Sequence, residues 1–213
     1  MNTRNLPTVT LANFAWPNVI AEQTIQNLLS NNSGFPTHNT NGILLYGEPG
    51  TGKTPLARLL PDAIEAKYSG NQARATFTPI KSGQNNVELN SSIFTTGSLS
   101  TLGATQHHYF VLDEIDNLTD DAMKQFMLVM NQPDTVFVMT TNNFSAVSAR
   151  VRGRCKKIKM SPDSPDSYVP WVRSVLQYCG VTDPKMLSSQ WIKDEIIEYG
   201  NNVREILSRI DDL

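Results

Sequence analysis

The sequence predicts an α/β fold, a parallel five-stranded sheet flanked by helices, followed by a small all-α domain. Between residues 42 and 160, short runs of β-forming residues alternate with helical patterns, an order typical of parallel sheets. The strongest runs are continuously apolar, which indicates strands covered on both faces. After residue 160 the apolar spacing becomes purely helical. We therefore expect an α/β domain over residues 1–160 and a helical domain over residues 161–213.

Composition supports a globular chain. The 213 residues are 39% hydrophobic and 18% charged, with a net charge of −2, which excludes a disordered chain and a strongly basic nucleic-acid-coating protein. Cys155 and Cys179 are too few for a disulfide scaffold. No apolar run approaches the roughly 20 residues that span a bilayer, and the first residues lack a signal-peptide core. We expect a cytoplasmic protein without membrane contact; a phage or virus protein acting in the host cytoplasm is also open.

The elements follow in order. An extended arm ends at Trp16-Pro17-Asn18, and apolar residues at helical spacing then predict a first helix from Val19 to Leu29. Two further helices are expected at about 53–67 and 119–130, the former ended or kinked at Leu60 by Pro61. The expected strands are Gly42–Tyr46, Val87–Leu89, Tyr109–Leu112, Val136–Met139 and Lys156–Met160.

The last part of the chain predicts three helices. Ser161-Pro162-Asp163-Ser164-Pro165 has the composition of a linker. One helical face then gathers Tyr168, Trp171, Val172, Val175 and Leu176, a second Trp191, Ile192, Ile196 and Ile197, and a third Val203, Ile206, Leu207 and Ile210.

A glycine-rich loop follows the first strand. Its residues fit the phosphate-loop pattern G-x-x-x-x-G-K-[ST] completely. Glycines let successive N–H groups point inward at anionic oxygens, and the following helix adds its positive end. Lys53 is expected to reach the β- and γ-phosphates, and the Thr54 hydroxyl to hold Mg²⁺. The residues expected to bind nucleotide are Gly47, Glu48, Pro49, Gly50, Thr51, Gly52, Lys53, Thr54 and Pro55.

A run of acids ends the strand at 109–112. Asp113 is expected beside the phosphate loop, where it would hold Mg²⁺ directly or through water. Glu114 is expected to orient and deprotonate the attacking water. Asp116 is interpreted as a cap of the next helix. His107-His108 lacks a third ligand at metal spacing and is read as a strand entry.

The loop and the Asp-Glu-Ile-Asp run together resemble the Walker A and Walker B motifs of AAA+ ATPases, which have a P-loop NTPase fold. In that family a polar residue at the end of a further strand contacts the γ-phosphate or the attacking water. Asn142, in Thr140-Thr141-Asn142-Asn143, matches that position. An amide suits this role because it both donates and accepts hydrogen bonds.

Gly153-Arg154-Cys155 resembles the Ser-Arg-Cys motif of clamp-loader subunits such as replication factor C. There the arginine acts in trans on ATP held by a neighbouring subunit, as an arginine finger. Six of the ten residues from Arg150 to Lys159 are basic, so a solvated basic edge or a phosphate-backbone contact stays open. Arg150 and Arg152 are weaker finger candidates.

Two further segments resemble the same family. Asn201-Asn202-Val203-Arg204 is similar to the start of the lid's last helix, where Arg204 would reach the γ-phosphate. Asn18-Val19-Ile20-Ala21-Glu22-Gln23 is similar to the segment that lines the adenine, which implies that Val19 and Ile20 contact the base.

The resemblance implies an ATP- and Mg²⁺-dependent ATPase of the clamp-loader type that works in DNA replication as an oligomer of like or unlike subunits. A collar domain is not expected, and a sliding clamp or a helicase would be the client. DNA contact has little support, because the segment between Leu89 and His108 is nearly uncharged. A helicase loader, a compact viral replication ATPase, a non-hydrolysing nucleotide-gated scaffold and a small-molecule kinase stay open as alternatives.

Overall fold

The computed structural model describes Thr3 and residues 6–30, 32–37, 39–81, 87–97, 105–132 and 134–212. Its centre is a sheet of five parallel strands in the order β2-β3-β4-β1-β5. The strands are β1 (Gly42–Tyr46), β2 (Ala75–Pro79), β3 (His108–Asp113), β4 (Thr135–Thr141) and β5 (Cys155–Lys159). Because all strands are parallel, their carboxyl ends lie along one edge of the sheet. The predicted fold class is confirmed.

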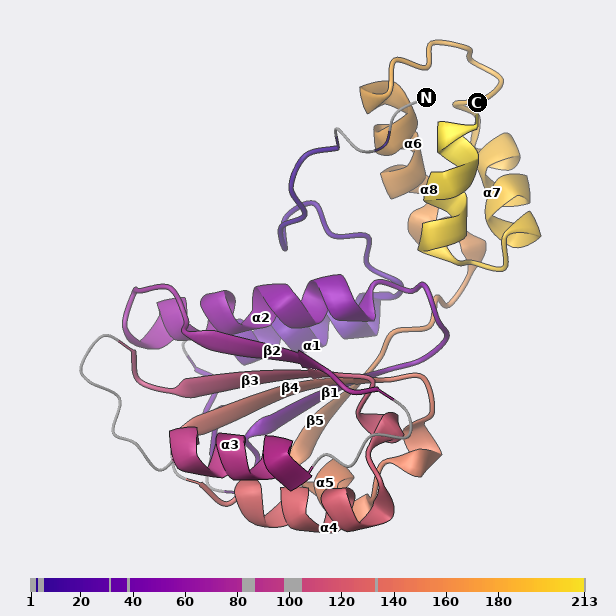
Figure 1. Ribbon diagram of the computed structural model, residues 1–213. Helices are drawn as coiled ribbons and strands as arrows, with labels where there is room; N and C mark the ends of the chain where they lie inside the picture. Colours follow the sequence, from indigo (N-terminus) through magenta and orange to yellow (C-terminus); the bar gives the residue numbers. More distant parts are fainter. Residues whose placement is uncertain are drawn as a thin grey trace.

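Helices cover both faces of the sheet (Figure 1). One face packs against α1 (Val19–Leu29) and α2 (Lys53–Tyr68), and the other against α3 (Val87–Gly97), α4 (Asp120–Val129) and α5 (Ala149–Gly153). Within β1, Ile43 and Leu45 join the core on the α1–α2 side, while Leu44 joins the core on the α3–α5 side. Burial on both faces explains why these strands are continuously apolar in sequence.

The predicted strand at Val87–Leu89 is wrong, because these residues begin helix α3. Over residues 90–97, where burial is described, Asn90, Ile93 and Gly97 are the buried positions and recur at helical spacing. The second strand is instead β2, an edge strand whose residues are exposed or half-buried. It therefore lacks the apolar run that marks the inner strands.

Two local expectations differ from the structure. Of the two outcomes expected for Pro61, an end or a kink of the helix, the end is wrong: α2 continues to Tyr68 with Pro61 inside it, because Leu60 and Ile64 pack in the core and stabilise the helix across one missing hydrogen bond. A kink at Leu60 stays a prediction. Asp116 does not cap the next helix. Thr119 caps α4, accepting a hydrogen bond from the backbone N–H of Ala122, and Asp116 lies in an earlier single turn of 3₁₀ helix.

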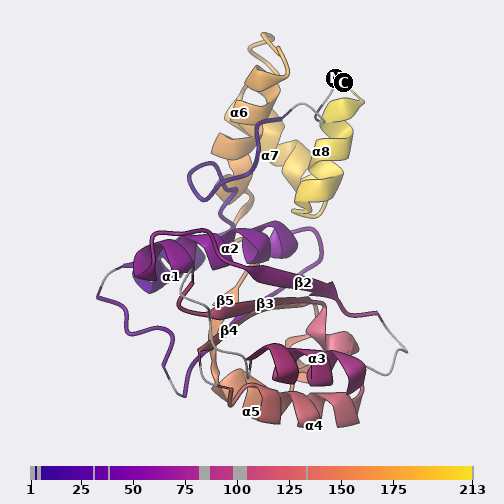
Figure 2. The ribbon, with the colours of Figure 1, turned by 60° about the vertical axis from the view of Figure 1, so that its left-hand side comes forward.

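The last three helices, α6 (Val169–Tyr178), α7 (Ser189–Glu198) and α8 (Val203–Asp211), form a separate bundle with its own core. Figure 2 shows the N-terminal arm running beside this bundle. The Thr3 hydroxyl donates to Asp211 over 2.7 Å, and Leu6 packs against the bundle core. The domain boundary at residue 160 stays a prediction. Among the described residues, none of the helices is long and apolar enough to span a membrane.

Candidate nucleotide site

The glycine-rich loop joins the end of β1 to the start of α2. Gly47, Gly50 and Gly52 have positive φ angles of 144°, 75° and 86°. Residues that carry a Cβ rarely adopt such angles. The Thr51 hydroxyl donates to the Glu48 carbonyl over 2.9 Å and holds the loop closed. Gly52 stands at the N-cap of α2 and brings no side chain to cap it. The first N–H groups of α2 therefore fit an anionic ligand.

Lys53 lies over this loop with its side chain buried. Its Nζ donates to the carbonyls of Gly47 and Glu48 over 2.9 and 2.6 Å. Burial lowers its pKa to about 8, although the carboxylates of Asp113 and Glu48 oppose the shift. A buried ammonium hydrogen-bonded to carbonyl groups gains strongly from an anionic ligand.

Asp113 ends β3 beside the loop. Its carboxylate accepts the Thr54 hydroxyl over 2.8 Å and the Thr140 hydroxyl over 2.6 Å. A hydroxyl and a carboxylate oxygen are the hard donors that Mg²⁺ prefers, usually completed by water and substrate phosphates. Within the described ranges, no group of three His, Cys, Asp or Glu side chains stands ready to bind a metal alone. Thr54 and Asp113 thus fit Mg²⁺ bound together with a phosphate ligand.

Glu114 follows in a left-handed conformation, with φ 59°, which costs about 1–2 kcal/mol for a residue with a side chain. Its N–H donates to the Thr140 hydroxyl over 2.9 Å, and its carbonyl accepts the N–H of Asn117 over 3.0 Å. The Asn117 side-chain amide also donates to Glu114 Oε2 over 3.2 Å. The surrounding contacts hold this backbone in place and expose the carboxylate.

A cavity of about 310 Å³ gathers most of the predicted site residues. Lys53, Thr54, Glu114, Asn142 and Arg204 all line it. The others on its wall are Pro49, Gly50, Gly52, Pro55, Thr140, Val203 and Leu207. Residues from the phosphate loop, two strand ends and the helical bundle therefore converge on one space.

The bundle touches the phosphate loop directly. The N–H of Val203, at the start of α8, donates to the Gly50 carbonyl over 2.9 Å. Asn202 caps α8 through the N–H of Arg204 over 3.0 Å. A Cβ on Gly50 would lie 1.8 Å from the Asn202 side-chain oxygen, so only glycine permits this approach.

A second, mostly apolar cavity of about 720 Å³ lies between the N-terminal arm and α6. Phe14, Trp16 and Trp171 line it, and Leu207 lies on the wall of both cavities. Val19, although 61% exposed, also lines this second cavity, whereas Ile20 is 72% exposed and does not. The contact of these two side chains with a base stays a prediction.

Arg154 lies away from its own phosphate loop. Its carbonyl accepts the N–H of Gly42, where β1 begins, and its guanidinium donates to the Met130 carbonyl over 3.4 Å. The loop begins at the other end of β1, about 13 Å along a strand of this length. Arg150 is exposed, and Arg152 lies over the Phe144 ring at 4.7 Å.

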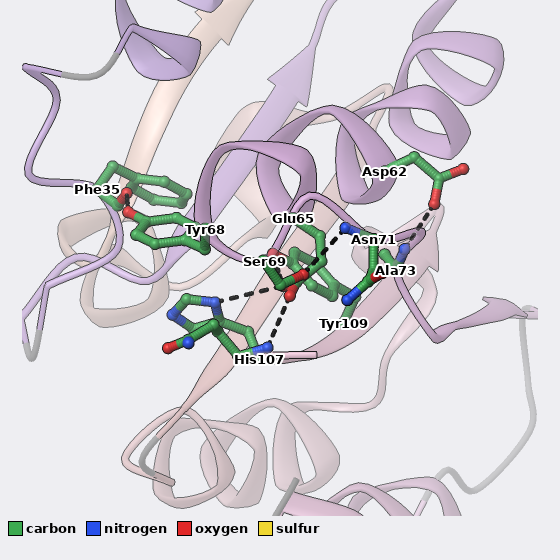
Figure 3. Close-up of polar contacts among 10 residues, drawn as sticks. Phe35, Asp62, Glu65, Tyr68, Ser69, Asn71, Ala73, His107 and Tyr109 are labelled. Atoms are coloured by element: carbon green, nitrogen blue, oxygen red, sulfur yellow. Dashed lines mark hydrogen bonds and ion pairs between the residues drawn. The ribbon is translucent and has the colours of Figure 1, made fainter. Parts of the chain in front are cut away.

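A second polar cluster lies at the far end of α2 and takes no part in this site (Figure 3). Glu65 is fully buried and accepts hydrogen bonds from the Tyr109 hydroxyl over 2.8 Å and the Gln106 N–H over 2.6 Å. Burial alone would raise the pKa of Glu65, but hydrogen bonds from Ser69, Gln106 and Tyr109 lower it overall. His107 Nδ1 lies 3.6 Å from the Glu65 carboxylate.

Comparison with known proteins identifies the family. Residues 43–162, more than half of the chain, match the model of the ATPase family associated with various cellular activities (AAA). The chain belongs to the AAA family.

The curated proteins to which this AAA chain is similar include subunits of replication factor C. Replication factor C small subunit 2 of Pyrobaculum islandicum is 25% identical over 145 residues, covering 67% of this chain and 45% of that protein. Replication factor C subunit 5 of Mus musculus is 25% identical over 185 residues, covering 78% of this chain and 51% of that protein. The human subunit 5 is 24% identical over 187 residues, with 78% and 52% covered. The chain spans about half the length of these relatives.

Sequence reasoning missed two residues of this AAA site. Thr140 joins Asp113 to the backbone of Glu114, and Asn117 holds the Glu114 side chain. The signal for Thr140 was its place at the end of a strand two residues before Asn142. The signal for Asn117 was weaker: it stands one turn of 3₁₀ helix after Glu114.

Proposed function

We propose that this AAA chain binds and hydrolyses ATP as a subunit of a clamp-loader-type assembly. The observation that carries the proposal is the cavity that gathers Lys53, Thr54, Glu114, Asn142 and Arg204. A phosphate cradle, a candidate base and two groups able to contact a γ-phosphate share one space, which is the set of parts that phosphoryl transfer to water requires.

Each residue has a separate task in the proposed reaction. The N–H groups of residues 50–54 and the Lys53 ammonium bind the phosphates, and Arg204 and Asn142 contact the terminal one. Thr54 and Asp113 hold Mg²⁺, which neutralises phosphate charge when bound. Glu114 orients the attacking water and accepts its proton.

The base is proposed to occupy the apolar cavity beyond Leu207. Phe14, Trp16 and Trp171 offer aromatic faces on which a purine can stack. Phe14 also lies against the phosphate loop, its ring 3.1 Å from the Cβ position of Gly52. The N-terminal arm, the loop and the bundle would then all contact one nucleotide.

Arg154 is proposed to act on a neighbouring subunit's ATP. Its position at the other edge of the sheet from its own loop supports action in trans. A finger in trans requires an oligomer of like or unlike AAA subunits, so ATP turnover depends on assembly.

The kinship with replication factor C subunits supports a role in DNA replication, with a sliding clamp or a helicase as the client. The proposed division is an α/β unit up to residue 160 and a helical lid after it. Asn202 and Val203 at Gly50 would make the lid angle sensitive to what the loop binds.

ATP turnover per subunit, measured across a wide range of protein concentration, tests the proposal. A rate that climbs and then saturates supports a site completed by a neighbour. A constant rate contradicts completion in trans, and the transfer of phosphate to a sugar or nucleoside favours a kinase. Lys53→Ala is the control, in which nucleotide binding is expected to be lost.

A further inference from the structure

Asn117 holds the side chain of Glu114. Its Nδ2 donates to Glu114 Oε2 over 3.2 Å and to the Ile80 carbonyl over 3.0 Å. One amide group therefore ties the exposed Glu114 carboxylate to the backbone just after β2.

Ile80 is a rigid anchor for this tie. It is 2% exposed, within the core on the α3–α5 side. Its N–H donates to the Asp113 carbonyl over 2.9 Å. The Ile80 N–H thus bonds the end of β3 at Asp113, and the Ile80 carbonyl holds Asn117, which in turn bonds the Glu114 carboxylate.

The Glu114 side chain needs such a tie. Its backbone is fixed by Thr140 and by the N–H of Asn117, but its side chain is exposed. An exposed glutamate exchanges among several rotamers. A base that must meet one water molecule works best when one rotamer is selected in advance.

We propose that Asn117 is a positioning residue for ATP hydrolysis. By engaging Oε2 it selects the Glu114 rotamer and leaves Oε1 to accept the proton of the attacking water. The proposal rests on the proposed ATPase function. It requires that removal of Asn117 slows turnover while ATP binding is unchanged, because Asn117 does not line the cavity of about 310 Å³ that Lys53 and Thr54 line.

Asn117→Ala tests this directly. We expect kcat to fall about tenfold to a hundredfold, the upper end being the cost of a catalytic group misplaced by about 1 Å. The dissociation constant for ATP should stay within about twofold of the original. Asn117→Asp has the same shape but cannot donate, so it should lose at least as much turnover. Circular dichroism and thermal unfolding identify the variant that stays folded for the comparison. Asn131→Ala, an exposed position at the other edge of the sheet, is the matched control.

The same substitution in a Glu114→Gln background separates positioning from a general structural effect. If Asn117 acts through Glu114, adding Asn117→Ala leaves the residual rate of Glu114→Gln unchanged. An equal loss in both backgrounds overturns the proposal, as does an unchanged or higher kcat in the single variant. Full activity of Glu114→Gln itself would instead overturn the proposed role of Glu114.

Discussion

Asp113 and Glu65 are two carboxylates held by hydroxyl donors at opposite edges of one sheet. Asp113 accepts the hydroxyls of Thr54 and Thr140, and Glu65 accepts that of Tyr109 together with a backbone N–H. Glu65 is 0% exposed, whereas Asp113 is half-buried and lies beside a cavity lined by its own two hydroxyl partners.

The difference in exposure indicates which carboxylate can take part in a reaction. Hydrogen bonds alone do not mark a functional carboxylate, because Glu65 is bonded as well as Asp113. The cavity beside Asp113 distinguishes the two carboxylates, since a ligand in it can replace or extend the contacts of Asp113. At Glu65 the donors enclose the carboxylate, and we expect a structural role.

Substitution of Arg154 is expected to cause the largest loss of ATP turnover. Arg154→Ala should bind ATP normally but lose about 10³–10⁵ in turnover, because the neighbouring site then lacks its finger. Mixing it with Glu114→Gln should restore part of the activity, since one partner supplies Arg154 and the other supplies Glu114. Phosphate release measured on the two variants, alone and mixed, checks this.

Arg74→Ala, at an exposed arginine outside the site, is the matched control for that experiment and should keep normal turnover. Wild-type turnover of Arg154→Ala would contradict the assignment of the finger. A mixture that stays inactive would contradict action in trans.

Glu114→Gln is expected to slow turnover by about 10²–10⁴, the usual contribution of a general base. ATP should still bind, because the cradle and Lys53 are intact, so the variant traps unhydrolysed nucleotide. Filter binding of labelled ATP and phosphate release measure the two effects separately. Glu198→Gln, on the exposed surface of α7, is the control, and an equal loss of activity there would contradict a specific role.

At the other carboxylate, the expected loss is of stability and not of turnover. Glu65→Gln replaces one acceptor oxygen by an amide donor, so either the Gln106 N–H or the proton of the Tyr109 hydroxyl loses its acceptor. We expect the free energy of unfolding to fall by about 1–3 kcal/mol, measured by urea denaturation. Turnover per folded molecule should be unchanged, and a loss of turnover in the folded variant would show that the two ends of α2 are coupled.

The parts of the molecule that can be predicted from sequence also differ between the Asp113 end and the Glu65 end of the sheet. The phosphate loop could be predicted because eight contiguous residues carry the pattern, and the strands at 42, 109 and 136 because both of their faces are buried. Edge strand β2 could not be, since its residues face solvent. The roles of Thr140 and Asn117 depend on side-chain contacts between segments, which residue spacing does not contain. Glu65 and Tyr109 meet only because α2 packs across the start of β3.

The pH dependence of stability is the smallest expected effect and again concerns the Glu65 edge. Burial lowers the pKa of His107 below its ordinary value near 6.5, although the Glu65 and Asp134 carboxylates oppose the shift. The unfolded chain therefore binds a proton at His107 more readily than the folded chain, so stability should fall as pH drops below about 6.5. The lowered pKa of Glu65, amid Tyr68, Tyr109 and His107, adds a second loss below about 4.5, the range of an unfolded glutamate. Urea denaturation from pH 8 to about 2.5 covers both ranges. His107→Gln should remove the upper part of the slope, and a slope unchanged in that variant would assign the acid sensitivity to other groups.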